Sequence, residues 1–125
     1  MKKAVILCGS MKVKNTILEV KEKLEKSGFN VLLPEECMKG INKSEASRAH
    51  FDRIIANDAY VLVVNVEKNG IKDYIGPNSL CEIAFSFFYN KKIFLLNDFY
   101  EPYRDELEGW KVIPLNGDLN KIKDF

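Results

Sequence analysis

The chain has 125 residues, a length that suits a single domain with one hydrophobic core. Its formal net charge is +1 and its lysines are spread along the chain, so the charge balance gives no reason to expect nucleic acid or an acidic membrane surface as a partner. Three widely spaced cysteines and a single histidine fit a reduced, cytoplasmic protein and carry no metal-binding signature, so no zinc site is expected.

The first apolar run, at residues 4–8, is too short for a signal peptide or a membrane span and predicts a buried strand. The helix that follows is expected to begin at a capping box formed by Thr16 and Glu19, and Gly28 is placed to end it. Residues 30–34 predict a second strand buried on both faces. The chain therefore opens with a strand-helix-strand unit.

The middle of the chain repeats this alternation. Glu35 and Glu36 are interpreted as a solvated turn, and Ser44 is expected to cap a second helix that runs to about Asn57. Residues 60–66 predict a third buried strand. The expected apolar stripe of the second helix consists of Phe51, Ile54 and Ile55.

A third helix is expected to begin at Asn78 or Ser79, after a long loop that ends in a Gly-Pro pair. Residues 92–97 predict a fourth buried strand, and residues 111–115 a fifth, placed at a sheet edge because its proline cannot donate a hydrogen bond to a neighbour. The apolar stripe of the third helix, at helical spacing, consists of Leu80, Ile83, Ala84, Phe87 and Phe88.

Strands that alternate with helices in this way predict an α/β fold. We expect one doubly wound, flavodoxin-like or Rossmann-like three-layer sandwich with a five-stranded parallel sheet, formed by residues 1–125 as a single domain. Ligands bind such sheets outside the carboxyl ends of the strands, and Asp58, which precedes a strand, lies at the opposite end and is expected to be a turn residue. The residues expected at the ligand-binding end are Gly9, Ser10, Lys12, Asn65, Tyr74, Gly76, Asn78, Ser79 and Glu82.

Glu82 has two interpretations. With Ser79 it completes an S-x-x-E capping box, in which the carboxylate accepts a hydrogen bond from the backbone at the start of its own helix. It also lies off the apolar stripe, on one face with Ser79, Ser86 and Tyr89, and a carboxylate held at the rim of the sheet can attack an anomeric carbon. The pattern of residues leaves both interpretations open.

Three motifs of the chain resemble the nucleoside 2-deoxyribosyltransferase-like superfamily, which includes the 2′-deoxynucleoside 5′-monophosphate N-glycosidases. They are "CGS" after the first strand, "DAYVLVVNV" at the third strand and "GPNSLCEIAFSFFYNKKIFLL" over the third helix and fourth strand. The resemblance covers roughly residues 4–97 and is narrower to a subgroup of small proteins. It implies that Glu82 is the catalytic nucleophile toward C1′ of deoxyribose, that Gly9 and Ser10 lie against the sugar or phosphate, and that the protein is a homodimer or higher homo-oligomer through the third helix.

The chain departs from the pattern of that superfamily in two places. His50 stands where relatives have an aspartate, with Asp52 displaced by half a helical turn, and Ala84 stands where relatives usually have glycine. A histidine can donate a proton near neutral pH, so His50 or Asp52 is expected to assist departure of the base. The same departure can mark a subgroup that binds a different ligand or has lost the reaction.

The function that the resemblance implies is cleavage of the N-glycosidic bond of a nucleoside or nucleoside 5′-monophosphate, by hydrolysis or by deoxyribosyl transfer, a reaction that needs no metal or organic cofactor. Asn78 and Ser79 at a helix N-terminus, with Ser10 and Lys12 opposite, can hold a phosphate. The alternative is a non-catalytic nucleotide-binding or sensing module on the same fold. The third helix also carries an aromatic cluster that is larger than one stripe requires, made of Phe85, Phe87, Phe88 and Tyr89. Since the stripe uses only Phe87 and Phe88, the other two are expected to meet a second subunit.

Overall fold

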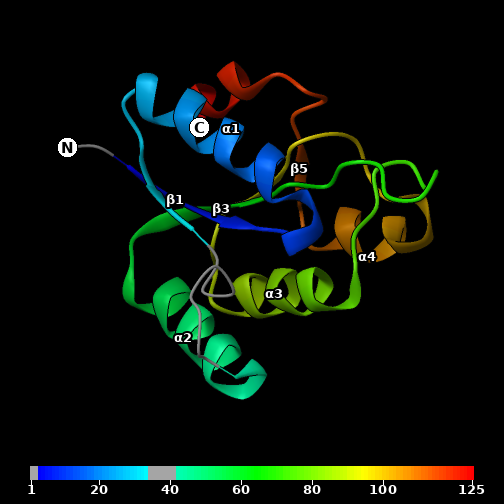
Figure 1. The fold of residues 1–125 in the computed structure, drawn as a ribbon, viewed down its shortest axis with the longest axis horizontal. Coiled ribbons are helices and arrows are strands. Elements are labelled where there is room, and N and C mark those ends of the chain that lie inside the picture. Colours follow the sequence, from blue (N-terminus) through cyan, green and yellow to red (C-terminus); the bar gives the residue numbers. More distant parts are fainter. Residues whose placement is uncertain (1–2, 34–41) are drawn as a thin grey trace.

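A five-stranded, all-parallel sheet forms the centre of the computed structural model, which describes residues 3–33 and 42–125 (Figure 1). Its order is β2-β1-β3-β4-β5, so the strand order reverses between β1 and β3. This confirms the predicted doubly wound sandwich and puts the fifth strand at an edge. The strands are β1 (Ala4–Cys8), β2 (Asn30–Leu32), β3 (Ala59–Val63), β4 (Ile93–Leu95) and β5 (Ile113–Pro114).

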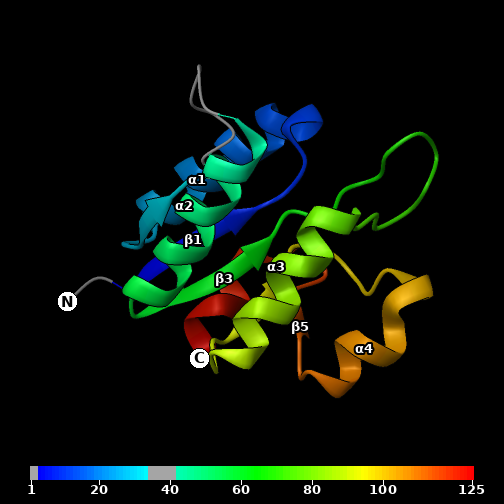
Figure 2. The same cartoon turned by 90° about the horizontal axis from the view of Figure 1, so that it is seen from below.

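Helices cover both faces of this sheet. The helix α1 (Lys14–Lys26) and a C-terminal 3-10 segment (Leu119–Asp124) pack on one face, through the core cluster that contains Ile17 and Ile122. On the other face lie α2 (Lys43–Ala56), α3 (Pro77–Phe88) and the short α4 (Arg104–Gly109). The view in Figure 2, from below, shows α2 and α3 side by side in front of the sheet. No helix within residues 3–33 and 42–125 has the length and apolar character needed to cross a membrane.

The first helix begins differently from the prediction and ends as predicted. A 3-10 turn at Met11–Val13 leads into α1, and the N-cap position is Val13, which makes no side-chain capping bond. The expected capping box at Thr16 is therefore wrong, since the turn has already started the helix. Gly28 ends α1 with a φ of +97°, and its amide donates to the carbonyl of Glu25. Only glycine adopts this backbone conformation without strain, so the predicted C-terminal glycine is confirmed.

The second helix begins two residues earlier than predicted. Its N-cap is Asn42, whose side chain accepts a hydrogen bond from the amide of Glu45 at 2.9 Å, so Ser44 lies inside the helix. Ile55 is 43% exposed and does not belong to the buried face. That face is spaced by four residues and consists of Ala46, His50 and Ile54. The turn expected at Glu35 and Glu36 lies outside the described residues.

The third helix is rotated about its axis, so that the face it buries differs from the predicted one. It begins at Pro77 after the N-cap Gly76, which makes no side-chain capping bond. Of the expected apolar stripe Ile83 is buried, whereas Phe87 and Phe88 are 42% and 76% exposed. The residues that α3 buries are Ser79, Glu82, Ile83 and Ser86. This helix therefore turns a largely polar face inward, and the hydroxyl of Ser86 is satisfied there by the carbonyl of Glu82 at 2.7 Å.

Candidate active site

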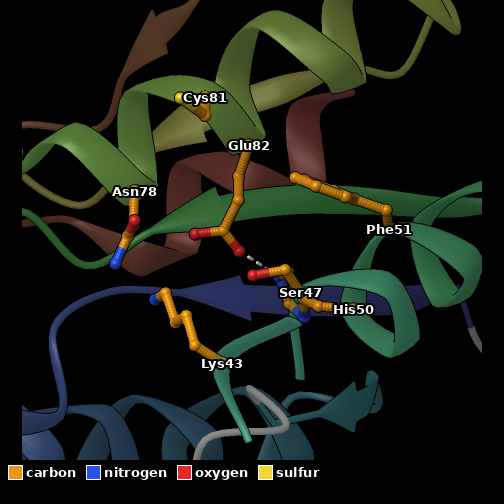
Figure 3. Close-up of a pocket in the computed structure, with 7 residues that line it drawn as sticks. All are labelled: Lys43, Ser47, His50, Phe51, Asn78, Cys81 and Glu82. Atoms are coloured by element: carbon orange, nitrogen blue, oxygen red, sulfur yellow. Dashed lines mark ion pairs between the residues drawn. The ribbon is translucent and has the colours of Figure 1, made fainter. Parts of the chain in front are cut away.

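Glu82 points from α3 across to α2 and does not cap its own helix. Its carboxylate Oε2 lies 2.5 Å from Nε2 of His50, and its side chain is only 11% exposed. Figure 3 shows the carboxylate between the two helices, with the ion pair to His50 drawn as a dashed line. The capping-box interpretation with Ser79 is therefore wrong. Glu82 is a buried carboxylate held by a side chain from a different element.

His50 connects three elements of the fold. It lies in the buried face of α2, is 1% exposed, and its Nε2 contacts both Glu82 and the Sγ of Cys8, the latter at 3.2 Å. Cys8 is the last residue of β1 and is fully buried. Among the described residues the other ring nitrogen, Nδ1, has no hydrogen-bond partner. A proton on Nε2 is therefore the one that the short contact with Glu82 uses.

The three side chains do not form a nucleophile-base-acid relay. In such a relay the base receives a proton at one ring nitrogen and is oriented by a carboxylate at the other. Here Cys8 and Glu82 meet the same nitrogen of His50, and Nδ1 faces neither of them. Cys8 is also fully buried, away from any substrate. Of the three side chains, Glu82 and His50 line a cavity and Cys8 lines neither of the two described below.

A cavity of about 280 Å³ opens between α2 and α3 next to this pair. Glu82 and His50 form part of its wall, and Phe51 supplies an aromatic surface (Figure 3). Phe51 is itself held by Phe85 of α3, with ring centroids 4.5 Å apart. The lining residues are Lys43, Ser47, His50, Phe51, Asn78, Cys81 and Glu82.

A second cavity, of about 330 Å³, adjoins the first at Glu82 and lies over the carboxyl end of β1. Three lysines line it against a single carboxylate, so its charge favours an anionic ligand group. The N-terminus of α3 also opens into it, where backbone amides and the helix dipole attract anions. Its lining consists of Gly9, Ser10, Lys12, Lys43, Lys68, Tyr74, Gly76, Pro77, Asn78, Ser79 and Glu82.

Two residues that line the second cavity, Gly9 and Tyr74, are held in place by close contacts with their neighbours. A Cβ atom added at Gly9 would lie 3.3 Å from Cδ1 of Ile17 and 3.5 Å from Cβ of Val64. A larger residue at this position would therefore have to push the side chain of Ile17 aside by a few tenths of an ångström. Tyr74 packs edge to face against Tyr100, with ring centroids 5.4 Å apart, and the Nζ of Lys68 lies 5.2 Å from its ring. Tyr74 is thus a fixed aromatic surface.

The structure brings most of the predicted site residues together. Glu82 and His50 are in direct contact, and seven of the predicted binding residues line the second cavity, namely Gly9, Ser10, Lys12, Tyr74, Gly76, Asn78 and Ser79.

Two predicted site residues lie elsewhere. Asp52 is exposed and lines neither cavity, because two residues after His50 it lies about 200° around α2. Asn65 is fully buried and its amide bonds to backbone groups, donating to the carbonyl of Asp98 at 2.7 Å and accepting from the amide of Asn97 at 3.0 Å. Asn65 therefore connects the loops around the site and lines neither cavity.

Some lining residues were not predicted from the sequence. Lys43 and Ser47 lie on the helical face of His50, at spacings of seven and three residues, so a helical plot centred on the histidine would have found them. Cys8 directly precedes the predicted Gly9 at the end of β1. No sequence pattern indicated that Lys68, Phe51 or Cys81 would line a cavity.

A comparison with protein-family models and with curated proteins finds no match to this chain.

Proposed function

We propose that the protein cleaves the N-glycosidic bond of a nucleoside or nucleoside 5′-monophosphate, with Glu82 as the nucleophile. The observation that carries the proposal is a buried carboxylate, released from helix capping, at the junction of two adjoining cavities. Ligand pockets usually occupy about 300–1,000 Å³, and the two cavities together fall in that range. The resemblance to the nucleoside 2-deoxyribosyltransferase-like superfamily supports the same reaction and the same glutamate.

His50 is assigned as a positioning residue for Glu82. Its Nε2 holds one carboxylate oxygen at 2.5 Å, which fixes the rotamer of a side chain that is otherwise flexible. The other oxygen points away from His50 in Figure 3, on the side of Asn78 and Lys43. One oxygen is thus tethered and the other faces the cavities, which is the arrangement that a carboxylate nucleophile requires.

The two cavities suit different ends of a nucleotide. The lysine-lined cavity and the N-terminus of α3 match a 5′-phosphate, for which Ser10 and Lys12 are in place on the opposite wall. Tyr74 in that cavity and Phe51 in the other provide aromatic surfaces on which a base or sugar can pack. With the phosphate at the lysines, the sugar lies at the junction, and its C1′ faces Glu82.

The proposed reaction has two steps. In the first, the free oxygen of Glu82 forms a bond to C1′ while the bond from C1′ to the base nitrogen breaks, and the base leaves with that electron pair. In the second, a water or an acceptor base attacks C1′ and releases the Glu82 carboxylate. Water gives hydrolysis and an acceptor base gives transfer, so the same residues serve both outcomes.

Neither residue expected to protonate the leaving base is suitably placed. His50 is buried and bonded to the nucleophile itself, in place of the separation of about 5 Å between catalytic groups that retaining glycosidases use. Asp52 lies outside both cavities. The departing base must then take its proton from solvent, and lack of a positioned acid costs about 10²–10⁴-fold in rate. We therefore expect slow turnover of ordinary nucleosides.

This reasoning selects a sharp substrate test. A purine nucleoside alkylated at N7 carries a fixed positive charge and leaves without protonation, so it should react at least tenfold faster than its unmodified counterpart. Base release would be followed by chromatography for ribo and deoxy forms, with and without a 5′-phosphate. Glu82→Gln removes the nucleophile at constant size and should abolish release, whereas Glu106→Gln on the exposed surface of α4 should not change it.

A non-catalytic nucleotide-binding module remains the second candidate, and one observation favours it. The contact of 2.5 Å with His50 lowers the freedom of Glu82 to approach a sugar. In this case a nucleotide would bind with measurable heat in calorimetry, yet no base would be released by wild type, even from the N7-alkylated substrates. The absence of both binding and release would contradict both candidates.

The proposal includes a homo-oligomer formed through α3. Phe87, Phe88 and Tyr89 at the end of the helix are 42%, 76% and 41% exposed, which is unusual for adjacent aromatic residues. Phe87 stacks on Trp110 at a centroid distance of 5.7 Å, and this pair extends the apolar surface onto α4. Only Tyr89 was expected on this surface, where Phe87 and Phe88 take the place of the partly buried Phe85, and the surface is proposed to meet a second copy.

A further inference from the structure

Three potential metal ligands from three different elements converge beside the site. They are Cys8 at the end of β1, His50 in α2 and Glu82 in α3, and their ligand atoms all lie within 4.8 Å of one another. Each is at most 8% exposed. Exposed carboxylates often cluster without binding a cation, but a buried thiol, imidazole and carboxylate in one place are the donor set of a transition-metal site.

We propose that Cys8, His50 and Glu82 bind a Zn²⁺ ion. The identity of the ion follows from its ligands, since a thiolate disfavours Mg²⁺ and Ca²⁺, whereas Zn²⁺ accepts sulfur, nitrogen and oxygen donors in one tetrahedral site. A thiolate and a carboxylate together balance the charge of the ion, so the buried complex is neutral overall. Zinc binding at this site lies outside the proposed glycosidase reaction, which uses no metal.

The geometry needs only small movements to accept the ion. The lone pair of Nε2 points between the other two donors, because this nitrogen contacts Sγ of Cys8 at 3.2 Å and Oε2 of Glu82 at 2.5 Å. Zn–N, Zn–S and Zn–O bonds of about 2.0, 2.3 and 2.1 Å in a tetrahedron separate nitrogen from sulfur by about 3.5 Å and nitrogen from oxygen by about 3.4 Å. The ion would replace the proton on Nε2 and push Glu82 back by about 0.9 Å.

The surroundings of the site determine its affinity and its access. Glu82 and His50 line the cavity between α2 and α3, from which an ion and a fourth ligand such as water can enter. A metal-bound histidine usually donates its second ring N–H to an acceptor, but Nδ1 of His50 has no partner among the described residues. Missing outer-shell support typically costs about 10–100-fold in metal affinity, so the zinc site should be reversible and removable by chelators.

Bound zinc would also inhibit the proposed glycosidase, a consequence that rests on the proposed function. A carboxylate whose Oε2 is coordinated to Zn²⁺ loses electron density to the ion, so its other oxygen becomes a weaker nucleophile toward C1′. Base release should then fall as zinc saturates the site and recover when a chelator is added. The binding test below needs no activity, so a failure of the metal proposal and a failure of the glycosidase proposal remain distinguishable.

The test uses Co²⁺ as a spectroscopic substitute for zinc in the full chain. After treatment with a chelator, the protein should bind one Co²⁺ with a thiolate-to-cobalt charge-transfer band, and Zn²⁺ should displace it. The double variant Cys37→Ser/Cys81→Ser leaves Cys8 as the sole thiol and should keep the band. Cys8→Ser should abolish the band, and Glu82→Gln should weaken Co²⁺ binding at least tenfold while the chain stays folded by circular dichroism.

Three results would overturn the proposal. The first is a wild-type chain that takes up no Co²⁺ and no Zn²⁺ in equilibrium dialysis. The second is a charge-transfer band that persists in Cys8→Ser and disappears in Cys37→Ser/Cys81→Ser. The third is a Co²⁺ affinity that is unchanged in Glu82→Gln, which assigns the metal to other ligands.

Discussion

Contact between His50 and Glu82 can be tested by a double-mutant cycle on the free energy of unfolding. Removing one member of a buried ion pair costs about 3–5 kcal/mol, but Glu82 faces a cavity that water can enter, so we expect about 2–3 kcal/mol for His50→Leu. Glu82→Leu leaves the imidazole buried without its partner and should cost about 1–3 kcal/mol. The double variant retains neither group and should lose about 1–3 kcal/mol less than the sum of the single variants.

The cycle would be measured by urea unfolding of all four proteins, followed by the fluorescence of the single tryptophan, Trp110, and by circular dichroism. Coincident transitions by the two probes establish the two-state behaviour that the analysis assumes. A matched control pairs Asp52→Leu with Glu82→Leu, because Asp52 lies on α2 near His50 in sequence but is exposed. The control cycle should be additive within about 0.5 kcal/mol. A His50/Glu82 cycle that is equally additive would refute the pairing.

Three further measurements test other parts of the structure. Asn65→Leu should lower the free energy of unfolding by about 2–4 kcal/mol in urea, because backbone groups of two loops lose their buried partner, and a loss below about 0.5 kcal/mol would contradict this role. Phe88→Asp should raise the dissociation constant of the homo-oligomer at least tenfold in analytical ultracentrifugation, and a monomeric wild type would contradict the proposed interface. A hydrogen bond from Lys3 and its charge hold the pKa of Asp58 below its ordinary 3.8, so the pair stabilises the fold fully above that pH and the contribution is lost as the pH falls through the lowered pKa. As the pH falls below 3.8, the urea concentration at the unfolding midpoint should therefore decrease less for Asp58→Asn than for wild type. An equal decrease in the two proteins would contradict this role of the pair.

The sheet could be predicted from the sequence because buried parallel strands leave a direct signal. Continuous apolar runs marked all five strands, and Pro114 placed the last one at an edge, as observed. The short helix α4 and the C-terminal 3-10 segment were not expected, since six-residue elements carry too little periodicity to be distinguished from loops. Helix starts were the weakest part. Thr16, Ser44 and Ser79 are all good capping residues, yet none of them caps the helix in which it lies.

The site was predictable as far as it depended on topology. Residues at the carboxyl ends of strands were placed correctly by the rule for doubly wound sheets, which is why Ser10, Tyr74 and Asn78 line the same cavity. The rule places backbone positions and does not say where side chains turn. Asn65 stands at the correct end of β3, but its amide is used by neighbouring loops. The pairing of His50 with Glu82 depends on how α2 and α3 are rotated about their axes, which no local pattern in one sequence reports.

The rotation of α3 explains the main error of the sequence interpretation and gives the helix two separate surfaces. A helix of ordinary amphipathic type buries its aromatic residues and exposes its carboxylates. This one buries polar residues, namely Glu82, Ser79 and Ser86, and leaves Phe87 and Phe88 exposed. The helix thereby gives up the free energy of burying two aromatic side chains, which contacts on its inner and outer faces must offset. On the inner side the offset comes from His50. On the outer side we propose that a second subunit supplies it, so the helix that carries the proposed nucleophile is also the one that the proposed interface holds in place. Loss of the oligomer should therefore lower activity as well as stability, because it frees the helix on which Glu82 is carried.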